Sequence, residues 1–185
     1  MKKSILVLLA ICFSANAFAA VAPFYKSKRE VEAILVNQDL AKKLGMSSIK
    51  SIQRTDNSKY FVQNQNCAVN VVVEHETPPP GLAGEPGIKK VVISNPICRA
   101  AAPAPRMVAP VYYTINEIRA IISTDKLAAL GGFINAIVGT ELNKYKVTVG
   151  NCAVNAVVEY VAHGNGVPRE PQIKGVKLSR PVCSR

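Results

Sequence analysis

The strongest alternation of apolar and polar positions spans residues 67–76 (CAVNVVVEHE). Here Cys67, Val69, Val71 and Val73 alternate with Ala68, Asn70, Val72 and Glu74. Because successive side chains of a β-strand point to opposite faces, this period of two predicts a strand whose Cys67 set faces a core. Three further segments of strand character lie at 49–55, 59–65 and 88–94.

Ahead of these strands the apolar residues take a helical spacing. Val31, Ile34 and Leu35 fall on one face of a helix. The segment SKRE (27–30) directly before them has Ser followed three residues later by Glu, so we expect a capping box that begins this helix. A second short helix is predicted at 40–44, ended by Gly45, which is suited to a left-handed cap.

The whole pattern recurs in the second half of the chain. The pentapeptide NCAVN occurs at 66–70 and again at 151–155, and at a shift of 85 residues 17 of 33 positions from Asn66 to Cys98 are identical. Upstream the shift is 87, and the same apolar stripe and Ser/Thr-x-x-Glu pattern return. The second set comprises TINE (114–117), the stripe Ile118, Ile121 and Ile122, a short helix at 126–130, Gly131, and strand segments at 135–140, 144–150, 152–161 and 173–179. The sequence therefore indicates an internal repeat.

These elements predict an α+β fold made of a tandem duplication of a unit of about 75 residues. Each unit is expected to be a bent N-terminal helical pair followed by an antiparallel β-meander with one disulfide. Repeat unit 1 is assigned to 24–99 and repeat unit 2 to 111–185. Residues 100–110, rich in alanine and proline, are interpreted as a semi-rigid linker.

The first nineteen residues have the pattern of a secretory signal peptide. Two lysines precede an apolar run, which ends in the small-residue motif AFA at 17–19. The apolar run is too short to span a bilayer. We therefore expect a periplasmic or secreted bacterial protein without a transmembrane segment.

Four of the five cysteines lie beyond this segment, and an even number in an exported chain predicts disulfides. Two copies of one fold should each close their own bridge, which gives Cys67–Cys98 and Cys152–Cys183. The closest pairs are 31 residues apart, so the spacing of a four-cysteine zinc site is missing. We expect no metal and no cofactor.

Neither copy of the repeat carries a visible set of catalytic residues. His75 aligns with Tyr160 and His163 with Pro78, so the two copies share no histidine position. Composition alone leaves a Ser-His-Asp triad open, but no G-x-S-x-G elbow is present. We interpret the protein as non-enzymatic.

The net charge is +11, or +9 without Lys2 and Lys3, and it is spread evenly over the two units. Few aromatic residues lie near basic runs, which argues against a specific nucleic-acid site. The densest basic group, Lys26, Lys28 and Arg29, is expected at a helix start. This charge supports an alternative function, the binding of anionic envelope polymers or lipid headgroups.

The leading functional hypothesis concerns the predicted hairpin loops TPPPGLAGEPG (77–87) and AHGNGVPREPQ (162–172). Long loops held by a disulfide-bonded scaffold commonly carry binding function, and prolines reduce the entropy lost on docking. We therefore expect an inhibitor-like or adaptor-like binding protein that engages a protein partner in the envelope or outside the cell. Its predicted contact residues are Pro79, Pro80, Gly81, Leu82, Gly166, Val167, Pro168 and Arg169.

Overall fold

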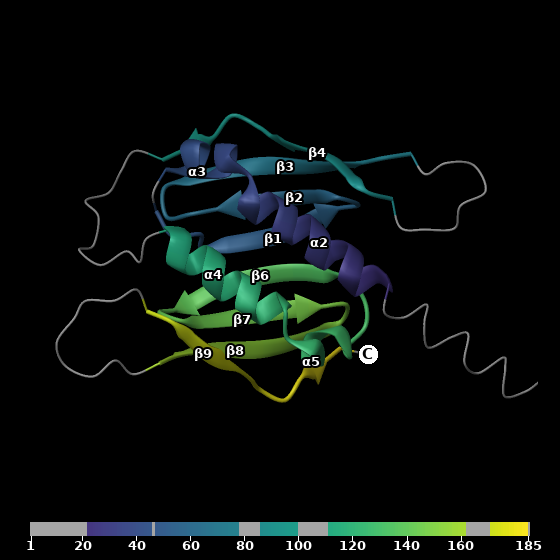
Figure 1. The fold of residues 1–185 in the computed structure, drawn as a ribbon, viewed down its shortest axis with the longest axis vertical. Coiled ribbons are helices and arrows are strands. Elements are labelled where there is room, and N and C mark those ends of the chain that lie inside the picture. The colour runs from purple at the N-terminus through teal and green to yellow at the C-terminus, as the bar shows by residue number, and fades with distance from the viewer. Residues whose placement is uncertain (1–21, 46, 78–85, 100–110, 162–170, 185) are drawn as a thin grey trace, which may run out of the picture.

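The computed structural model describes residues 22–45, 47–77, 86–99, 111–161 and 171–184. These residues form one large antiparallel sheet of ten strands (Figure 1), in the order β10-β8-β7-β6-β1-β2-β3-β4, with β5 beside β3 and β9 beside β8. The first five strands are β1 (Ser51–Asp56), β2 (Lys59–Gln63), β3 (Cys67–His75), β4 (Ile88–Ile93) and β5 (Ile97–Cys98). The others are β6 (Ile134–Glu141), β7 (Lys144–Val149), β8 (Cys152–Tyr160), β9 (Ile173–Leu178) and β10 (Val182–Cys183). The predicted signal peptide and linker lie outside the described residues.

The two halves of the chain share this sheet because β1 pairs with β6. Ser51 lies opposite Val138, Ile52 opposite Ile137, and Gln53 opposite Ala136. The predicted α+β fold class, with two separate helical-pair and meander units, is therefore wrong: the protein is primarily β, with few helices. The sequence could not indicate this pairing, because nothing in the local pattern of an edge strand specifies which distant strand it joins.

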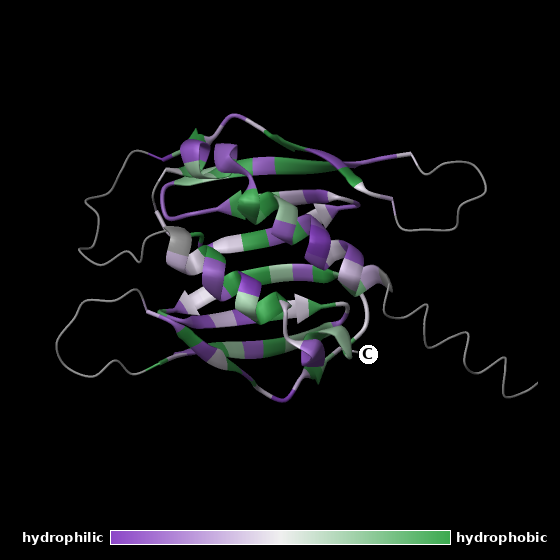
Figure 2. Cartoon of the chain, in the orientation of Figure 1, coloured by the Kyte–Doolittle hydropathy of each residue, from purple (hydrophilic) through white to green (hydrophobic). Residues whose placement is uncertain are grey.

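In the described ranges, four helices cover one face of the sheet (Figure 1). They are α2 (Ala22–Val36), α3 (Gln38–Leu44), α4 (Val111–Ile122) and α5 (Asp125–Ala128). The predicted stripes Val31, Ile34 and Leu35 and Ile118, Ile121 and Ile122 are buried against the strands in a single core. Figure 2 shows apolar and polar residues alternating along the strands, as expected when only one face of a sheet is buried.

The predicted capping boxes are not helix starts. Helix α2 begins at Ala22, so Ser27 and Glu30 lie in its interior, with both side chains buried. Ser27 Oγ donates to the Phe24 carbonyl at 2.9 Å and accepts from the Ile134 amide of β6 at 2.9 Å. The Ser-x-x-Glu spacing places both residues on one face of a helix as readily as it forms a cap, and burial decides here.

The basic group at 26–29 likewise lies inside α2 and not at a helix start. Lys26 Nζ donates to Asn57 Oδ1 at 3.2 Å and lies 4.0 Å from Glu30 Oε1. Lys28 Nζ lies 4.0 Å from Glu32 Oε1. These contacts neutralise part of the charge that the sequence suggested for a polyanion.

Both edges of the sheet change register by one residue. Val71 faces Ile93 in the β3–β4 pair, whereas Cys67 faces Cys98 in the β3–β5 pair, so one extra residue lies between β4 and β5. The disulfides Cys67–Cys98 and Cys152–Cys183 join directly opposed residues, with Cα atoms 4.0 Å and 3.9 Å apart. The structure thus contains both predicted bridges. Pro96 and Pro181 in the two interruptions have no amide hydrogen, which limits further pairing at these edges.

Candidate functional site

The side chains that alternate with the core residues point to the face of the sheet that no described helix covers. We call this surface the open face. In the first half it comprises Gln53, Lys59, Phe61, Gln63, Ala68, Asn70, Val72, Glu74, Lys90, Val92 and Ile97. In the second half it comprises Ala136, Val138, Lys144, Lys146, Thr148, Ala153, Asn155, Val157, Glu159, Lys177 and Val182.

A group of apolar side chains lies on the first half of the open face. Val72 and Val92 lie opposite each other on β3 and β4 and are 37% and 36% exposed. Ile97 lies opposite Ala68 and is 72% exposed. Phe61 faces Asn70 across β2 and β3, so its ring lies diagonal to Ala68 and Val72. We call Phe61, Ala68, Val72, Val92 and Ile97 the apolar patch.

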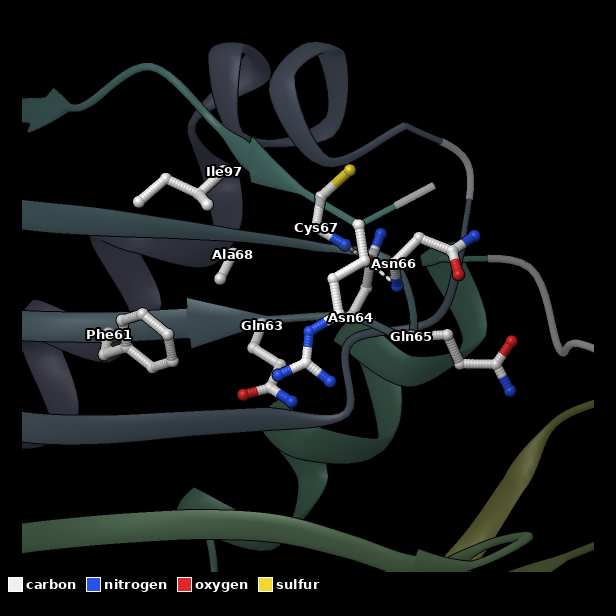
Figure 3. A pocket seen from close by; sticks show the side chains of 9 residues that line it. Phe61, Gln63, Asn64, Gln65, Asn66, Cys67, Ala68 and Ile97 are labelled. Carbon is white, nitrogen blue, oxygen red and sulfur yellow. Dashed lines mark hydrogen bonds between the residues drawn. The ribbon is translucent and has the colours of Figure 1, made fainter. Parts of the chain in front are cut away.

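A hollow of about 210 Å³ adjoins this patch where β2 turns into β3 (Figure 3). One wall is apolar and is formed by Phe61, Ala68 and Ile97. The lining also includes the polar side chains of Gln63, Gln65, Asn66 and Arg99, which we call the polar wall. The hollow therefore offers one cationic group and several amides beside an aromatic ring.

Asn64 holds the turn that forms the polar wall. Its buried Nδ2 donates to the Leu44 carbonyl at 2.6 Å, and its Oδ1 accepts from the amides of Asn66 and Cys67 at 2.9 Å and 2.6 Å. The Arg99 amide in turn donates to the Asn66 carbonyl at 2.8 Å. The backbone that carries the polar side chains is therefore fixed to helix α3 and to the disulfide-bonded edge.

The second half of the sheet has different residues at several of the positions that line this hollow. Lys146, Thr148, Gly150 and Ser184 stand at the places of Phe61, Gln63, Gln65 and Arg99. The internal repeat could not indicate these residues. Identical positions mark what the two halves share, whereas the distinctive chemistry of the hollow lies at positions where the halves differ.

The recurring asparagines lie beside the edge segments of the sheet. The backbone amide of Asn70 donates to Ser94 Oγ, and the backbone amide of Asn155 donates to Ser179 Oγ, both at 2.9 Å. Asn151 Nδ2 donates to the Ser184 carbonyl. These contacts tie the edge segments to β3 and β8.

A second polar group is buried on the helix-covered face. The carboxylate of Glu30 accepts from the Tyr60 hydroxyl and, at 2.7 Å, from Ser58 Oγ, and His75 Nε2 lies 2.8 Å from Glu30 Oε1. Glu117 in the second half accepts from the hydroxyls of Tyr145 and Tyr160.

Burial and these carboxylate bonds raise the pKa of all three tyrosine hydroxyls above the usual value. Ser58 Oγ and Glu30 Oε1 both contact Nε2 of His75, while Nδ1 is buried with no partner among the described residues. A catalytic triad instead places its serine and carboxylate on opposite ring nitrogens. We interpret this network as the polar attachment of α2 to the sheet.

The eight predicted loop residues, from Pro79 to Leu82 and from Gly166 to Arg169, lie outside the described residues. The bases of the two loops are described: the Glu76 amide donates to the Gly87 carbonyl, and the Val161 amide donates to the Gln172 carbonyl, both at 2.8 Å. Because β1 and β6 are antiparallel, β3 and β8 also run in opposite directions. The loops therefore leave the sheet at opposite ends.

Within the described ranges, no group of three or more His, Cys, Asp or Glu side chains is arranged to hold a metal ion. The candidate functional site is the open face, with its apolar patch and hollow. Comparison of the chain with protein-family models, with curated proteins and with solved structures gave no match.

Proposed function

We propose that the protein is an exported, non-enzymatic binding protein that captures a protein partner on the open face of its sheet. The apolar patch is the observation that carries this proposal. Contiguous apolar side chains on the surface of a monomer commonly mark a site of protein association. The patch lies on a sheet whose other face is packed against helices, so its backbone is rigid and little entropy is lost on binding.

The charges around the patch favour a partner with an apolar centre and acidic surroundings. Lys90 is two residues before Val92 on the same face of β4. Arg99 borders the adjoining hollow. Complementary charges at the rim of an interface accelerate association and select the partner.

Export rests on the predicted signal peptide, from which we infer a periplasmic or secreted location. The two disulfides are compatible with a compartment outside the cytoplasm. Among the described helices, none has the length and apolar composition that crossing a bilayer requires.

An anionic polymer or lipid headgroup is the alternative ligand. Three lysines of the open face already contact carboxylates: Lys59 with Asp56 at 3.1 Å, Lys144 with Glu141 at 2.6 Å, and Lys177 with Glu159 at 2.5 Å. This local pairing weakens the positive field that a polyanion would use, and it favours the protein partner. A polymer would show affinity that falls steeply between low and physiological salt.

The proline-rich hairpin loops remain a prediction of contact with the same partner. Since their bases lie at opposite ends of the sheet, we expect each loop to contact a different region of that partner. Deleting residues 78–86 and 163–171 while retaining the fold should weaken capture.

The test combines capture with affinity measurement. The mature chain is used to isolate its partner from an envelope extract, and the purified partner is then titrated calorimetrically against Val72→Glu and Val92→Glu. Each substitution should weaken binding at least about ten-fold, because it places a charge in the centre of the interface. Val36→Glu is the matched control, since Val36 is 59% exposed but belongs to helix α2. Equal affinities of all three variants for the partner would exclude the open face as its binding site.

A further inference from the structure

We propose that the hollow between Phe61 and Arg99 binds a carboxylate group, borne by an acidic side chain or by the C-terminus of a partner chain. This inference rests on the proposed function, because it assigns one anchoring contact to the partner on the open face. It depends on the polar side chains of the hollow, although Phe61, Ala68 and Ile97 belong to the apolar patch as well, and it is tested separately.

The polar wall of the hollow has unused hydrogen-bonding capacity. The guanidinium of Arg99 and the side-chain amides of Gln63, Gln65 and Asn66 form no hydrogen bond or ion pair within the described part of the chain. A guanidinium presents its donors in a planar fork that matches the two oxygens of a carboxylate. Each amide adds further N–H donors to the same space.

The hollow is small, and one of its walls is apolar. Its volume of about 210 Å³ is smaller than the roughly 300 Å³ at which pockets for whole small-molecule ligands begin. A single side chain or chain terminus suits this space. The Phe61 ring and the Ile97 and Ala68 side chains would contact the aliphatic stem that carries the carboxylate (Figure 3).

Glu74 of the open face lies too far from the hollow to occupy it. Glu74 lies six residues beyond Ala68 on the same strand, about 20 Å along β3. A single guanidinium with neutral amides also matches a singly charged carboxylate better than a doubly charged phosphate. The occupant is therefore expected to come from another molecule.

The second half of the sheet supplies a built-in comparison. At the corresponding place Ser184 replaces the guanidinium, Lys146 replaces the ring, and Gly150 has no side chain to donate. The combination of a forked guanidinium with an aromatic wall is thus expected in the first half and not at the corresponding place of the second. Replacing Arg99 by the serine found in the second half removes the proposed anchor with little risk to the fold, because Arg99 is exposed.

The experiment uses the full mature chain, labelled with ¹⁵N, and three small probes. N-acetyl-leucyl-glutamate amide carries a side-chain carboxylate, N-acetyl-leucine carries a terminal carboxylate, and N-acetyl-leucyl-glutamine amide is the uncharged control. Saturable shifts are expected in the side-chain signals of Gln63, Gln65 and Arg99 with one or both carboxylate probes. Which of the two binds more tightly identifies the source of the carboxylate.

Arg99→Ser should weaken carboxylate binding at least ten-fold, and Arg99→Lys should weaken it less because the charge is kept while the fork is lost. Unchanged backbone signals elsewhere verify the fold of each variant. The inference is overturned if neither carboxylate probe saturates below about 20 mM, if the glutamine probe binds equally, or if Arg99→Ser binds as the wild type does. Loss of partner binding in Val72→Glu with no carboxylate binding would overturn this inference alone. Carboxylate binding with no effect of Val72→Glu on partner affinity would overturn only the proposed function.

Discussion

The carboxylate of Glu30, in the middle of helix α2, accepts a hydrogen bond from the hydroxyl of Tyr60 on β2, and both side chains are buried. Ser58 Oγ, in the turn before β2, and His75 Nε2, on β3, contact the same carboxylate. The helix is therefore attached to the sheet by a satisfied buried charge as well as by its apolar stripe.

Removing this carboxylate should destabilise the protein strongly. In Glu30→Ala the hydroxyls of Tyr60 and Ser58 lose their buried acceptor, and we expect the free energy of unfolding to fall by about 3 kcal/mol. Urea unfolding followed by circular dichroism measures this change. Glu32→Ala is the control: its partly exposed carboxylate lies 4.0 Å from Lys28 Nζ, and its loss should cost less than about 0.5 kcal/mol. Equal costs for both variants would contradict the role given to Glu30.

The second half predicts which replacement His75 tolerates. Tyr160 occupies the corresponding place and donates its hydroxyl to Glu117. We therefore expect His75→Tyr to preserve a donor to Glu30 and to be less destabilising than His75→Ala, which should cost about 1 to 3 kcal/mol. Urea midpoints of the two variants decide this, and a tyrosine variant as unstable as the alanine variant would refute the equivalence.

Alkaline pH should destabilise the fold through its buried tyrosines. Burial raises the pKa of the Tyr60 and Tyr145 hydroxyls above the value near 10 that they have in the unfolded chain. Above about pH 10 unfolding then releases protons, so the stability that these groups contribute is complete below pH 10 and is lost as pH rises.

Each of Tyr60→Phe and Tyr145→Phe should reduce the slope of unfolding free energy against pH by up to about 1.4 kcal/mol per unit above pH 10. Denaturant unfolding at several pH values between about 9 and 11 measures the slope. A slope that neither substitution changes would mean that these hydroxyls ionise as readily in the folded protein as in the unfolded chain.

The shared sheet predicts one cooperative unfolding transition. Replacing Cys152 and Cys183 by serine opens a bridge between residues 31 positions apart and should lower stability by roughly 3 to 4 kcal/mol. Because β1 and β6 join the halves, we expect the whole transition to move to lower denaturant concentration. Circular dichroism and the signals of each half should report the same midpoint. Two separate transitions, with the first half unaffected, would contradict the fold.

A close backbone contact near β6 gives a further test. Gly132 has a φ of +85°, and a Cβ added there would lie 2.7 Å from the Cα of Gly150. Gly132→Ala should therefore cost at least about 2 kcal/mol, through both the strained backbone and the clash. Gly175→Ala, where nothing lies within 4 Å and φ is not in the positive region, is the control and should be nearly neutral. Thermal unfolding of both variants distinguishes these outcomes.

Much of the local structure was predictable from the sequence. The period of two in 67–76 correctly gave β3 and its buried valines, and the matched cysteines gave both disulfides. The predicted left-handed glycine caps are not found: Gly45 follows α3 with a φ of +75° but a ψ of −172°, and α5 ends at Ala128 with Ala129 as its C-cap. The features that were predicted correctly are local or repeated. These features depend on neighbouring residues or on the repeated spacing, which a sequence shows directly.

Other features depend on contacts between distant segments. Ser27 and Glu30 satisfy the pattern of a helix cap, yet the chain continues the helix five residues upstream and uses both side chains to contact strands. The hollow was missed for a related reason: Phe61 and Arg99 are 38 residues apart and meet only through the pairing of β2, β3 and β5. Their chemistry follows from the sequence, whereas their proximity follows from the sheet.

The three residue pairs between β1 and β6 determine more than the width of the sheet. Ile52 and Ile137 face each other on the helix-covered side, which places the helices of both halves on that side. A slip of one residue in this pairing would turn one half over, because neighbouring side chains of a strand point in opposite directions. The helices of that half would then lie on the side of the sheet that carries the open face of the other half. The sidedness of the entire molecule is therefore encoded in a junction of three residues on each strand.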